Sequence, residues 1–454
     1  MSAARALPLV AILGRPNAGK STLFNRLTGA RKAIVHDEPG VTRDLNYGEA
    51  EWRGQSFVVV DTGGFEPDPE TPLKKQIQEQ TRLAIEEADV VVFLFDGKAG
   101  LAPLDQEAIG LLRRARKPTL FAVNKIDTSA KEVQRYEFFR LGVEEVFPIS
   151  AEHGLGLAAL LDRIVASLPQ TQAGAEEPDQ AGALPLRIAV VGRPNVGKSS
   201  LVNRLVGYER ALVDAAPGTT RDATDTPFSW EGDDYVLVDT AGIRRKARIA
   251  DRLERYSVLR ALRSVDRAQL LIHVIDALEG ASAQDAQILS YALRRGKAVV
   301  LAVNKWDLVR PQERDAEGYR QRVFARLAFA DFAPLVFISA RTGLGIGELM
   351  ALVRRASSSY QKTVPTAQLN RVLQEAVRAH APASYQGRQV KLYYATQTGT
   401  APPTFTLFVN FPAAIKPDYE RFLVHQLRAS LALDHTPVRL HFRARRDERP
   451  GRRR

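Results

Sequence analysis

Short apolar runs alternate with amphipathic stretches along most of this chain. In the first third the apolar runs are LVAIL, FVVVD, VVVFLFD, LFAVNK and VFPIS. Each is short, continuous and rich in β-branched or aromatic residues, which is typical of strands that are covered on both faces. Between them lie segments such as KSTLFNRLTG and LDQEAIGLLRRA, whose apolar residues recur at helical spacing. The alternation predicts an α/β fold with a mostly parallel sheet and helices on both faces.

The apolar pattern occurs twice, and each copy carries the same series of polar motifs. The offset between the copies grows from 178 to 189 residues along the series. The motifs are GRPNAGKS at 14–21, PGVTRD at 39–44, DTGG at 61–64, NKID at 124–127 and SA at 150–151, and in the second copy GRPNVGKS at 192–199, PGTTRD at 217–222, DTAG at 239–242, NKWD at 304–307 and SA at 339–340. The repeat predicts two similar domains in tandem.

Composition marks the boundaries between the parts of the chain. We expect a first domain at 1–168 and a second at 186–358. Residues 169–185, PQTQAGAEEPDQAGALP, combine Pro, Gly, Ala and acids with almost no large apolar residue, so they predict a flexible acidic linker. At 359–443 the pattern predicts a small α/β domain made of a helix, two strands, a second helix and a final strand. Residues 444–454 predict a basic tail.

The bulk composition narrows the class of protein. The chain has 454 residues, of which 45% are hydrophobic, and this suits several globular domains. It has no cysteine, which excludes disulfides, thiolate metal sites and cysteine nucleophiles and is compatible with a reducing cytoplasm. The first apolar run leads directly into a glycine-rich loop, so it predicts a buried strand and not a signal peptide. No run approaches the ~18 apolar residues that a membrane span needs. We expect a cytoplasmic monomer.

Positive charge is concentrated at the C-terminal end. The formal net charge is +12, and from Gln361 onward 16 basic and 6 acidic residues give 16 − 6 = +10. A basic region of this kind predicts a phosphate-rich partner, most simply a nucleic acid. The alternative is a solvated tail that only aids solubility.

The motif at 14–21 has the spacing of a phosphate-binding loop between a strand and a helix. Its glycines let backbone N–H groups turn toward phosphates, and the following helix adds a partial positive charge. Lys20 is expected to neutralise the β- and γ-phosphates, and Ser21 to bind Mg²⁺. The residues expected to hold nucleotide in the two loops are Gly14, Asn17, Gly19, Lys20, Ser21 and Thr22, and Gly192, Asn195, Gly197, Lys198, Ser199 and Ser200.

Two further motifs complete the metal site and detect the γ-phosphate. Asp61 and Asp239 are expected to hold Mg²⁺ through water, and the glycine three residues later is expected to contact the γ-phosphate. A threonine in each PG-rich loop is the expected second Mg²⁺ ligand, with a turn or a helix N-cap as the alternative role. The expected catalytic residues are therefore Lys20, Thr42 and Gly64 in the first copy and Lys198, Thr220 and Gly242 in the second.

The NKxD motifs select the base. A carboxylate at Asp127 or Asp307 can accept hydrogen bonds from the N1–H and 2-amino groups of guanine, whereas adenine offers an acceptor at N1 and no 2-amino group. The lysines are expected to stack their stems over the base. The residues expected to line the base pocket are Asn124, Lys125, Asp127, Ser150 and Ala151, and Asn304, Lys305, Asp307, Ser339 and Ala340. The sequence therefore predicts that GTP and GDP, not adenine nucleotides, are the ligands.

These motifs together resemble those of the bacterial double-Era-type GTPases called Der or EngA. The resemblance rests on the tandem GRPNxGKS domains with PGxTRD, DTxG and NKxD, and on KLYYATQTGTAPPTFTLFVNFP at 391–412. It implies a GTPase that assists maturation of the large (50S) ribosomal subunit, with nucleotide-dependent domain rearrangement controlling its binding to rRNA and no role for DNA. It also implies a KH-like fold at 359–443, although the Gly-x-x-Gly loop that KH domains use to hold RNA is missing there.

Two other functions stay open at this point. One is an RNA- or protein-binding scaffold in which one GTPase domain holds nucleotide without switching, although complete motifs in both copies count against it. The other is a membrane-associated or tRNA-modifying GTPase of the same superfamily, for which no amphipathic membrane helix or cofactor-binding segment stands out.

The residues after DTxG point to an unusual route of hydrolysis. Many GTPases place a glutamine there to orient the attacking water, but Phe65 and Ile243 stand at these positions. We therefore expect slow hydrolysis. In related GTPases an asparagine at the position of Asn17 and Asn195 binds K⁺ beside the phosphates, which predicts stimulation by K⁺. The alternative is that these asparagines only shape the loop.

Overall fold

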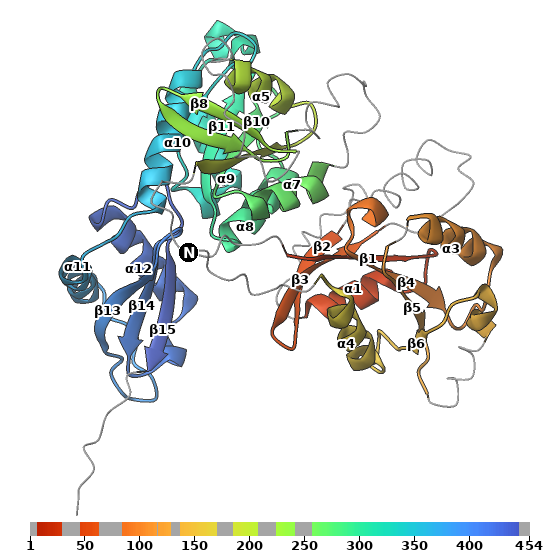
Figure 1. Cartoon of the computed structure of the whole chain (residues 1–454). Helices are drawn as coiled ribbons and strands as arrows, with labels where there is room; N and C mark the ends of the chain where they lie inside the picture. The colour runs from red at the N-terminus through yellow and green to blue at the C-terminus, as the bar shows by residue number, and fades with distance from the viewer. Residues whose placement is uncertain are drawn as a thin grey trace, which may run out of the picture. The chain divides into compact units, whose positions relative to one another are not determined.

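Two compact units make up the protein, Met1–Asp179 and Gln180–Arg454. The computed structural model (Figure 1) describes residues 7–29, 46–62, 84–115, 117–128, 137–169, 185–207, 224–240 and 257–444. Nearly all of the expected linker at 169–185 lies outside the described residues, and so does the tail from residue 445 onward.

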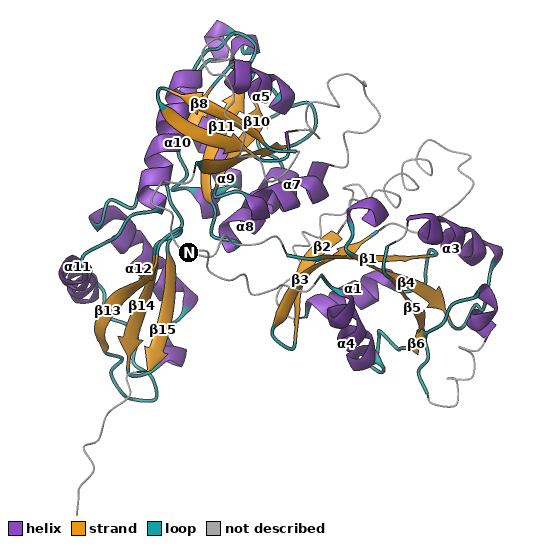
Figure 2. Ribbon diagram, viewed as in Figure 1, coloured by secondary structure: helices purple, strands orange, loops and turns teal. Residues whose placement is uncertain are grey.

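A six-stranded sheet forms the centre of the first unit, with the order β2-β3-β1-β4-β5-β6. All neighbouring strands are parallel except β2 and β3. Figure 2 shows α1 and α4 on one side of this sheet and α3 on the other, which confirms the predicted layers. The elements are β1 (Leu9–Gly14), α1 (Lys20–Thr28), β2 (Asn46–Trp52), β3 (Gln55–Asp61), β4 (Val90–Asp96), α3 (Pro103–Ala115), β5 (Thr119–Asn124), β6 (Val146–Pro148) and α4 (Leu157–Ser167).

The central strand β4 shows why these strands read as continuous apolar runs. All seven of its residues are buried. Val92 and Leu94 belong to the core that α1 and α4 cover. Phe93 and Phe95 alternate with them and form an aromatic cluster, in which the ring centroids of Phe95 and Phe138 are 4.6 Å apart. Because both faces of the sheet are covered, the strand is apolar throughout except at its last residue, Asp96.

The antiparallel strands at the edge of each repeat are missing from the sequence prediction. Strand β2 has the sequence NYGEAEW, which is too polar to read as a buried run. It pairs with β3 through a two-residue turn, Arg53-Gly54, in which both residues have positive φ. The second repeat makes the same hairpin with Glu231-Gly232. Such turns match the twist of a hairpin, so a residue followed by glycine was the available signal.

The second unit begins with a sheet of the same design, with the order β12-β11-β10-β7-β9-β8. Only β8 and β9 pair in antiparallel fashion. The elements are β7 (Leu186–Gly192), α5 (Lys198–Gly207), β8 (Thr226–Trp230), β9 (Asp233–Leu237), α7 (Ser257–Arg267), β10 (Leu270–Asp276), α8 (Ala283–Arg294), β11 (Ala298–Asn304), α9 (Ala316–Arg326), β12 (Leu335–Phe337) and α10 (Ile346–Tyr360).

The same unit ends in a three-stranded sheet with the order β13-β14-β15 and two helices. Strands β13 and β14 are antiparallel, and β15 is parallel to β14. Apolar residues of both helices and of the sheet form a core separate from that of the second repeat. The elements are α11 (Thr366–Ala379), β13 (Leu392–Gly399), β14 (Thr404–Val409), α12 (Pro417–Ser430) and β15 (Arg439–Ala444), in the order that the sequence predicts.

Candidate nucleotide sites

Each phosphate loop connects the end of a strand to the start of a helix. In the first repeat β1 ends at Gly14 and α1 begins at Lys20. Gly19 has a φ of 91°, and a Cβ placed on it would lie 2.3 Å from Nδ2 of Asn124. Only glycine satisfies both conditions. The second loop repeats this arrangement, because a Cβ on Gly197 would lie 2.2 Å from Nδ2 of Asn304.

The lysine of each loop folds back over the loop itself. Nζ of Lys20 donates to the carbonyl oxygens of Gly14, at 3.2 Å, and Arg15, at 2.8 Å. Burial lowers the pKa of Lys20, and the nearby carboxylate of Asp61 partly opposes this. In the second repeat Nζ of Lys198 donates to the carbonyl of Gly192 at 2.9 Å and to that of Arg193. Both ammonium groups therefore lie inside the loops where the phosphates are expected.

Ser21 and Asp61 meet at the mouth of the first loop. Oγ of Ser21 donates to Oδ2 of Asp61 at 2.7 Å. Oδ1 of Asp61 is buried and has no hydrogen-bond partner among the described residues, and burial raises the pKa of this carboxyl group. A hydroxyl beside a carboxylate with an unused oxygen is a donor set that suits Mg²⁺.

The corresponding aspartate of the second repeat is held differently. Asp239 has a left-handed backbone with a φ of 58°, whereas Asp61 continues strand β3. Its Oδ2 accepts a hydrogen bond of 3.3 Å from Oγ of Ser264, which belongs to α7. Ser199, the metal ligand expected from the second phosphate loop, lies in the first turn of α5. Four other expected metal and γ-phosphate residues lie outside the described residues: Thr42, Gly64, Thr220 and Gly242.

The asparagine of each NKxD motif bridges two loops. Nδ2 of Asn124 donates to the carbonyl of Ala18 in the phosphate loop, at 2.8 Å, and its Oδ1 accepts from the amide of Ala151, at 2.9 Å. Asn304 makes the same pair of bonds to Val196, at 2.7 Å, and Ala340, at 2.9 Å. The side chain thus ties the phosphate loop to the loop expected beside the base, a role that the motif alone does not reveal.

The lysine of each NKxD motif is positioned by an aspartate that sequence reasoning missed. Lys125 and Lys305 have left-handed backbones with φ of 70° and 64°. Nζ of Lys125 lies 2.5 Å from Oδ2 of Asp96, and that of Lys305 lies 2.5 Å from Oδ2 of Asp276. Burial raises the pKa of Asp96, but hydrogen bonds from Lys125 and two backbone amides outweigh it, so this pKa is lowered. The signal was present, because an aspartate ends the same apolar strand in both repeats.

The expected base-reading carboxylates stand beside the serine of each SA loop. Oδ1 of Asp127 accepts a hydrogen bond of 3.0 Å from Oγ of Ser150. In the second repeat, a hydrogen bond from Ser339 is the largest cause that lowers the pKa of Asp307, and Arg341 contributes with Nη2 at 2.7 Å from Oδ2. The lowered pKa of Asp307 favours its ionised form, as an acceptor for a donor pair requires.

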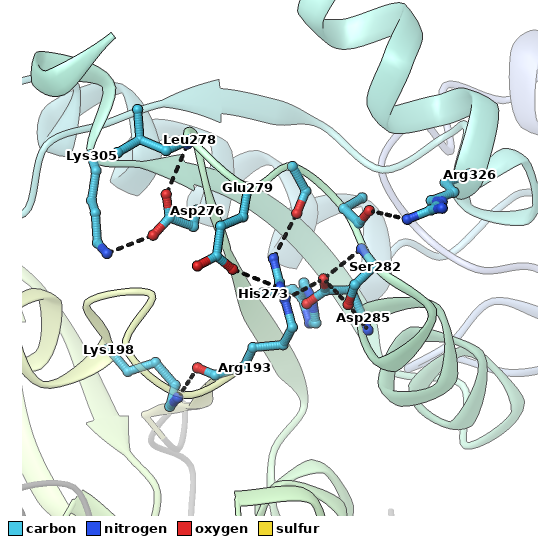
Figure 3. A network of polar contacts seen from close by, with 12 residues as sticks. Arg193, Lys198, His273, Asp276, Leu278, Glu279, Ser282, Asp285, Lys305 and Arg326 are labelled. Carbon is cyan, nitrogen blue, oxygen red and sulfur yellow. Dashed lines mark hydrogen bonds and ion pairs between the residues drawn. The ribbon is translucent and has the colours of Figure 1, made fainter. Parts of the chain in front are cut away.

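The arginine that follows the first glycine of each loop is anchored away from the phosphates. Nε of Arg193 lies 3.0 Å from Oδ2 of Asp285, and its Nη1 lies 2.8 Å from Oε2 of Glu279 (Figure 3). Oδ1 of Asp285 lies 2.9 Å from Nε2 of His273, and both of these side chains are fully buried. Asp285 also closes a capping box with Ser282 at the start of α8.

The first repeat has the arginine and the aspartate but not the histidine. Nε of Arg15 lies 3.1 Å from Oδ1 of Asp105, and Phe93 occupies the position that corresponds to His273. Burial raises the pKa of Asp105, whereas hydrogen bonds, with that from His273 foremost, outweigh burial and lower the pKa of Asp285. The two phosphate loops are thus supported by different buried charge networks.

Comparison with known proteins agrees with this geometry. Residues 9–125 and 187–305 match the family described as 50S ribosome-binding GTPase, and residues 363–443 match the KH-domain-like C-terminal family of EngA bacterial GTPase enzymes. GTPase Der of Syntrophotalea carbinolica is 48% identical over 439 residues, which are 97% of this chain and 99% of that relative. The chain belongs to the GTPase Der family. GTPase Der of Geobacter metallireducens is also 48% identical, over 97% of this chain and 99% of its own length.

Membership of the Der family confirms several expectations. The chain is a GTP-hydrolysing enzyme with two tandem GTPase domains and a KH-like C-terminal domain.

Among solved structures, the G domain of the FeoB iron transporter of T. maritima is 29% identical to this chain. The match covers 35% of this chain and 98% of that G domain, with a TM-score of 0.29. Within the described residues, no helix has the length and apolar content to span a bilayer.

Proposed function

We propose that this Der-family GTPase assists the assembly of the large ribosomal subunit, and that nucleotide binding controls its attachment to rRNA. Two observations support the proposal. The family that matches both GTPase domains is described as 50S ribosome-binding. The C-terminal part carries the basic charge that an RNA partner requires. GTP favours one arrangement of the domains and GDP another, so each state presents a different surface to the ribosome.

The observation that supports GTP binding by both domains is the similarity of the two nucleotide sites. In each, loop amides and a lysine that folds back over the loop would bind phosphates, and an asparagine bridge joins the expected base pocket to the phosphate loop. Mg²⁺ supplies charge neutralisation on the phosphates. The residues that would hold it are Ser21, Thr42 and Asp61 in the first domain and Ser199, Thr220 and Asp239 in the second.

Separate inactivation of the two sites tests whether both domains switch. Lys20→Ala and Lys198→Ala each remove one charge-assisted phosphate contact, so each should weaken GTP binding at its own site by roughly 10- to 100-fold. Both variants should lose GTP-dependent co-sedimentation with large subunits, measured in parallel with GTP, GDP and a non-hydrolysable analogue. If one variant co-sediments like the wild type, that domain is a static nucleotide holder and the scaffold alternative gains support.

The asparagines of the phosphate loops are proposed to bind K⁺ and so promote hydrolysis. GTP hydrolysis should be faster in KCl than in NaCl at equal ionic strength. Asn17 and Asn195 have left-handed backbones, with φ of 65° and 59°, a conformation that asparagine tolerates better than most residues. Loop shaping alone would therefore also explain their presence.

Glycine substitution separates these two roles. Asn17→Gly and Asn195→Gly keep the left-handed backbone accessible but remove the side-chain oxygen. If the oxygens bind K⁺, each single variant should lose only the stimulation of its own domain, and the double variant Asn17→Gly/Asn195→Gly should hydrolyse GTP at the same rate in KCl and NaCl. Stimulation by K⁺ that survives in the double variant would contradict the proposal, and so would equal rates in the wild type.

A further inference from the structure

One face of the C-terminal sheet is not covered by its helices. Helices α11 and α12 pack on the face that carries Ala395, Phe405, Leu407 and Leu440. The opposite face carries Tyr394, Phe408 and Arg443, which lie side by side on β13, β14 and β15 because Tyr394 pairs with Phe408 and Phe408 with Arg443. We call these three residues the aromatic platform.

The two aromatic rings of the platform are stacked, with Tyr394 exposed to solvent and Phe408 half-buried. Their centroids are 4.4 Å apart and their planes differ by 14°. Tyr394 is 44% exposed, and the preceding Tyr393, at an irregularity in the strand pairing, is 39% exposed. Large aromatic side chains that gather at an exposed surface mark binding sites more often than isolated ones do.

The surroundings of the platform are polar and basic. The rest of this face carries Thr396, Thr398, Thr404 and Thr406, and His441. Strands β13, β14 and β15 contain no aspartate or glutamate. The chain continues from β15 directly into RRDERPGRRR at 445–454, with six arginines and two acids. The threonine hydroxyls on β14 are bonded within the protein, Thr404 to the carbonyl of Pro402 and Thr406 to Thr398, so they do not select a partner. The exposed ring and the basic charge do: a polyanion with flat aromatic groups matches both, whereas an apolar protein partner would match only the rings.

The other end of the sheet is already occupied by the second GTPase domain. Nη2 of Arg439, at the start of β15, donates to the carbonyl of Arg294 at the end of α8, at 2.6 Å. The amide of Ala401, in the loop before β14, donates to the carbonyl of Tyr360, at 2.9 Å. The platform lies at the far ends of these strands, because Phe408 and Arg443 are four residues beyond Thr404 and Arg439 in the same register.

We propose that the aromatic platform binds single-stranded RNA by stacking a base on Tyr394, while Arg443 contacts the phosphates. This rests on the proposed function, because it names the contact by which the C-terminal domain meets rRNA. The site differs from the Gly-x-x-Gly clamp of KH domains, which this chain lacks. Stacking tolerates any base, so binding should show little sequence preference.

Binding of a fluorescently labelled oligouridylate to the full chain, followed by anisotropy at several KCl concentrations, tests the proposal. Tyr394→Ala should weaken binding about tenfold, within the range measured for loss of one stacked base. It should leave the slope of affinity against salt unchanged. Arg443→Ala should reduce that slope by about one phosphate contact. Tyr394→Phe keeps the ring and should bind like the wild type.

An oligonucleotide of equal length with abasic positions supplies the second arm. The wild type should bind it about as weakly as Tyr394→Ala binds oligouridylate, and Tyr394→Ala should bind both equally. The proposal is overturned if Tyr394→Ala binds oligouridylate like the wild type, if Tyr394→Phe is as weak as the alanine variant, or if the wild type binds neither. The last result, with co-sedimentation intact, would assign the platform to a protein partner and leave the ribosomal role standing. If the wild type binds oligouridylate but does not co-sediment with large ribosomal subunits, the proposed function is overturned and the platform proposal stands.

Discussion

Replacing Asp285 by alanine is expected to lower the free energy of unfolding of the second GTPase domain by about 3–5 kcal/mol. The side chain of Asp285 is fully buried and accepts contacts from Arg193, at 3.0 Å, and His273, at 2.9 Å. Without the carboxylate, the guanidinium of Arg193, whose side chain is only 17% exposed, loses a buried counter-charge. The capping box at the start of α8 is lost as well.

The three tryptophans of the chain make this change measurable by domain. Trp52 lies in the first unit, and Trp230 and Trp306 lie in the second domain. In a Trp52→Phe background, urea unfolding followed by tryptophan fluorescence reports the second domain alone. We expect the midpoint to fall markedly in the Asp285→Ala variant.

Asp105→Ala provides the matched control in the first domain. Asp105 binds Arg15 at 3.1 Å but has no histidine partner, since Phe93 stands at that place. The loss of stability should therefore be smaller than for Asp285→Ala, when Trp52 is used as the reporter in place of the other two tryptophans. Equal losses in the two domains would show that His273 adds nothing to the network.

Alanine at Asp307 or Asp127 is expected to abolish the preference of the affected site for GTP over ATP. A carboxylate that pairs with guanine and repels the N1 acceptor of adenine can discriminate by about 10⁴-fold, and alanine removes both effects. The loss should appear mainly as weaker GTP binding. Competition of GTP and ATP against a fluorescent GTP analogue measures it, with the other site disabled by Lys20→Ala or Lys198→Ala.

Arg341→Ala is the control for the second site. Arg341 contacts the carboxylate of Asp307 at 2.7 Å but is itself 75% exposed. Its removal keeps the acceptor oxygens and the hydrogen bond from Ser339, so the preference for guanine should persist. If Asp307→Ala retains a strong preference for GTP, the base is recognised by other groups and the assignment of Asp307 is wrong.

Much of the fold could be predicted because the strands are buried on both sides. The runs FVVVD, VVVFLFD and LFAVNK become β3, β4 and β5 as expected, with β5 ending one residue before the end of its run. The hairpin strand β2 could not be read as a strand, because only one of its edges is paired and its sequence is largely polar. Apolar runs in a sequence reveal strands that are buried, and an edge strand that is half-exposed has few apolar residues to reveal it.

The supporting parts of the sites were harder to predict than the motifs themselves. Arg15 and Arg193 sit inside the phosphate loops, and a basic residue there suggests a phosphate contact. Their partners Asp105 and Asp285 begin helices 90 and 92 residues later, and only the fold brings these groups together. The repeat did contain the signal, since the same arginine and aspartate recur in both copies. The contact between His273 and Asp285 has no such signal, because the histidine occurs in one copy only.

The asparagine bridge has a consequence for how a nucleotide is assembled into its pocket. Asn124 joins the carbonyl of Ala18, on the phosphate side, to the amide of Ala151, on the base side. Ordering either side therefore orders the other, and the entropic cost of fixing the two loops is met once for the whole ligand. A nucleoside alone and a triphosphate alone would each bear that full cost. The binding free energy of the intact nucleotide should therefore exceed the sum for the two separate fragments. The pocket thus selects ligands in which base and phosphate are covalently joined.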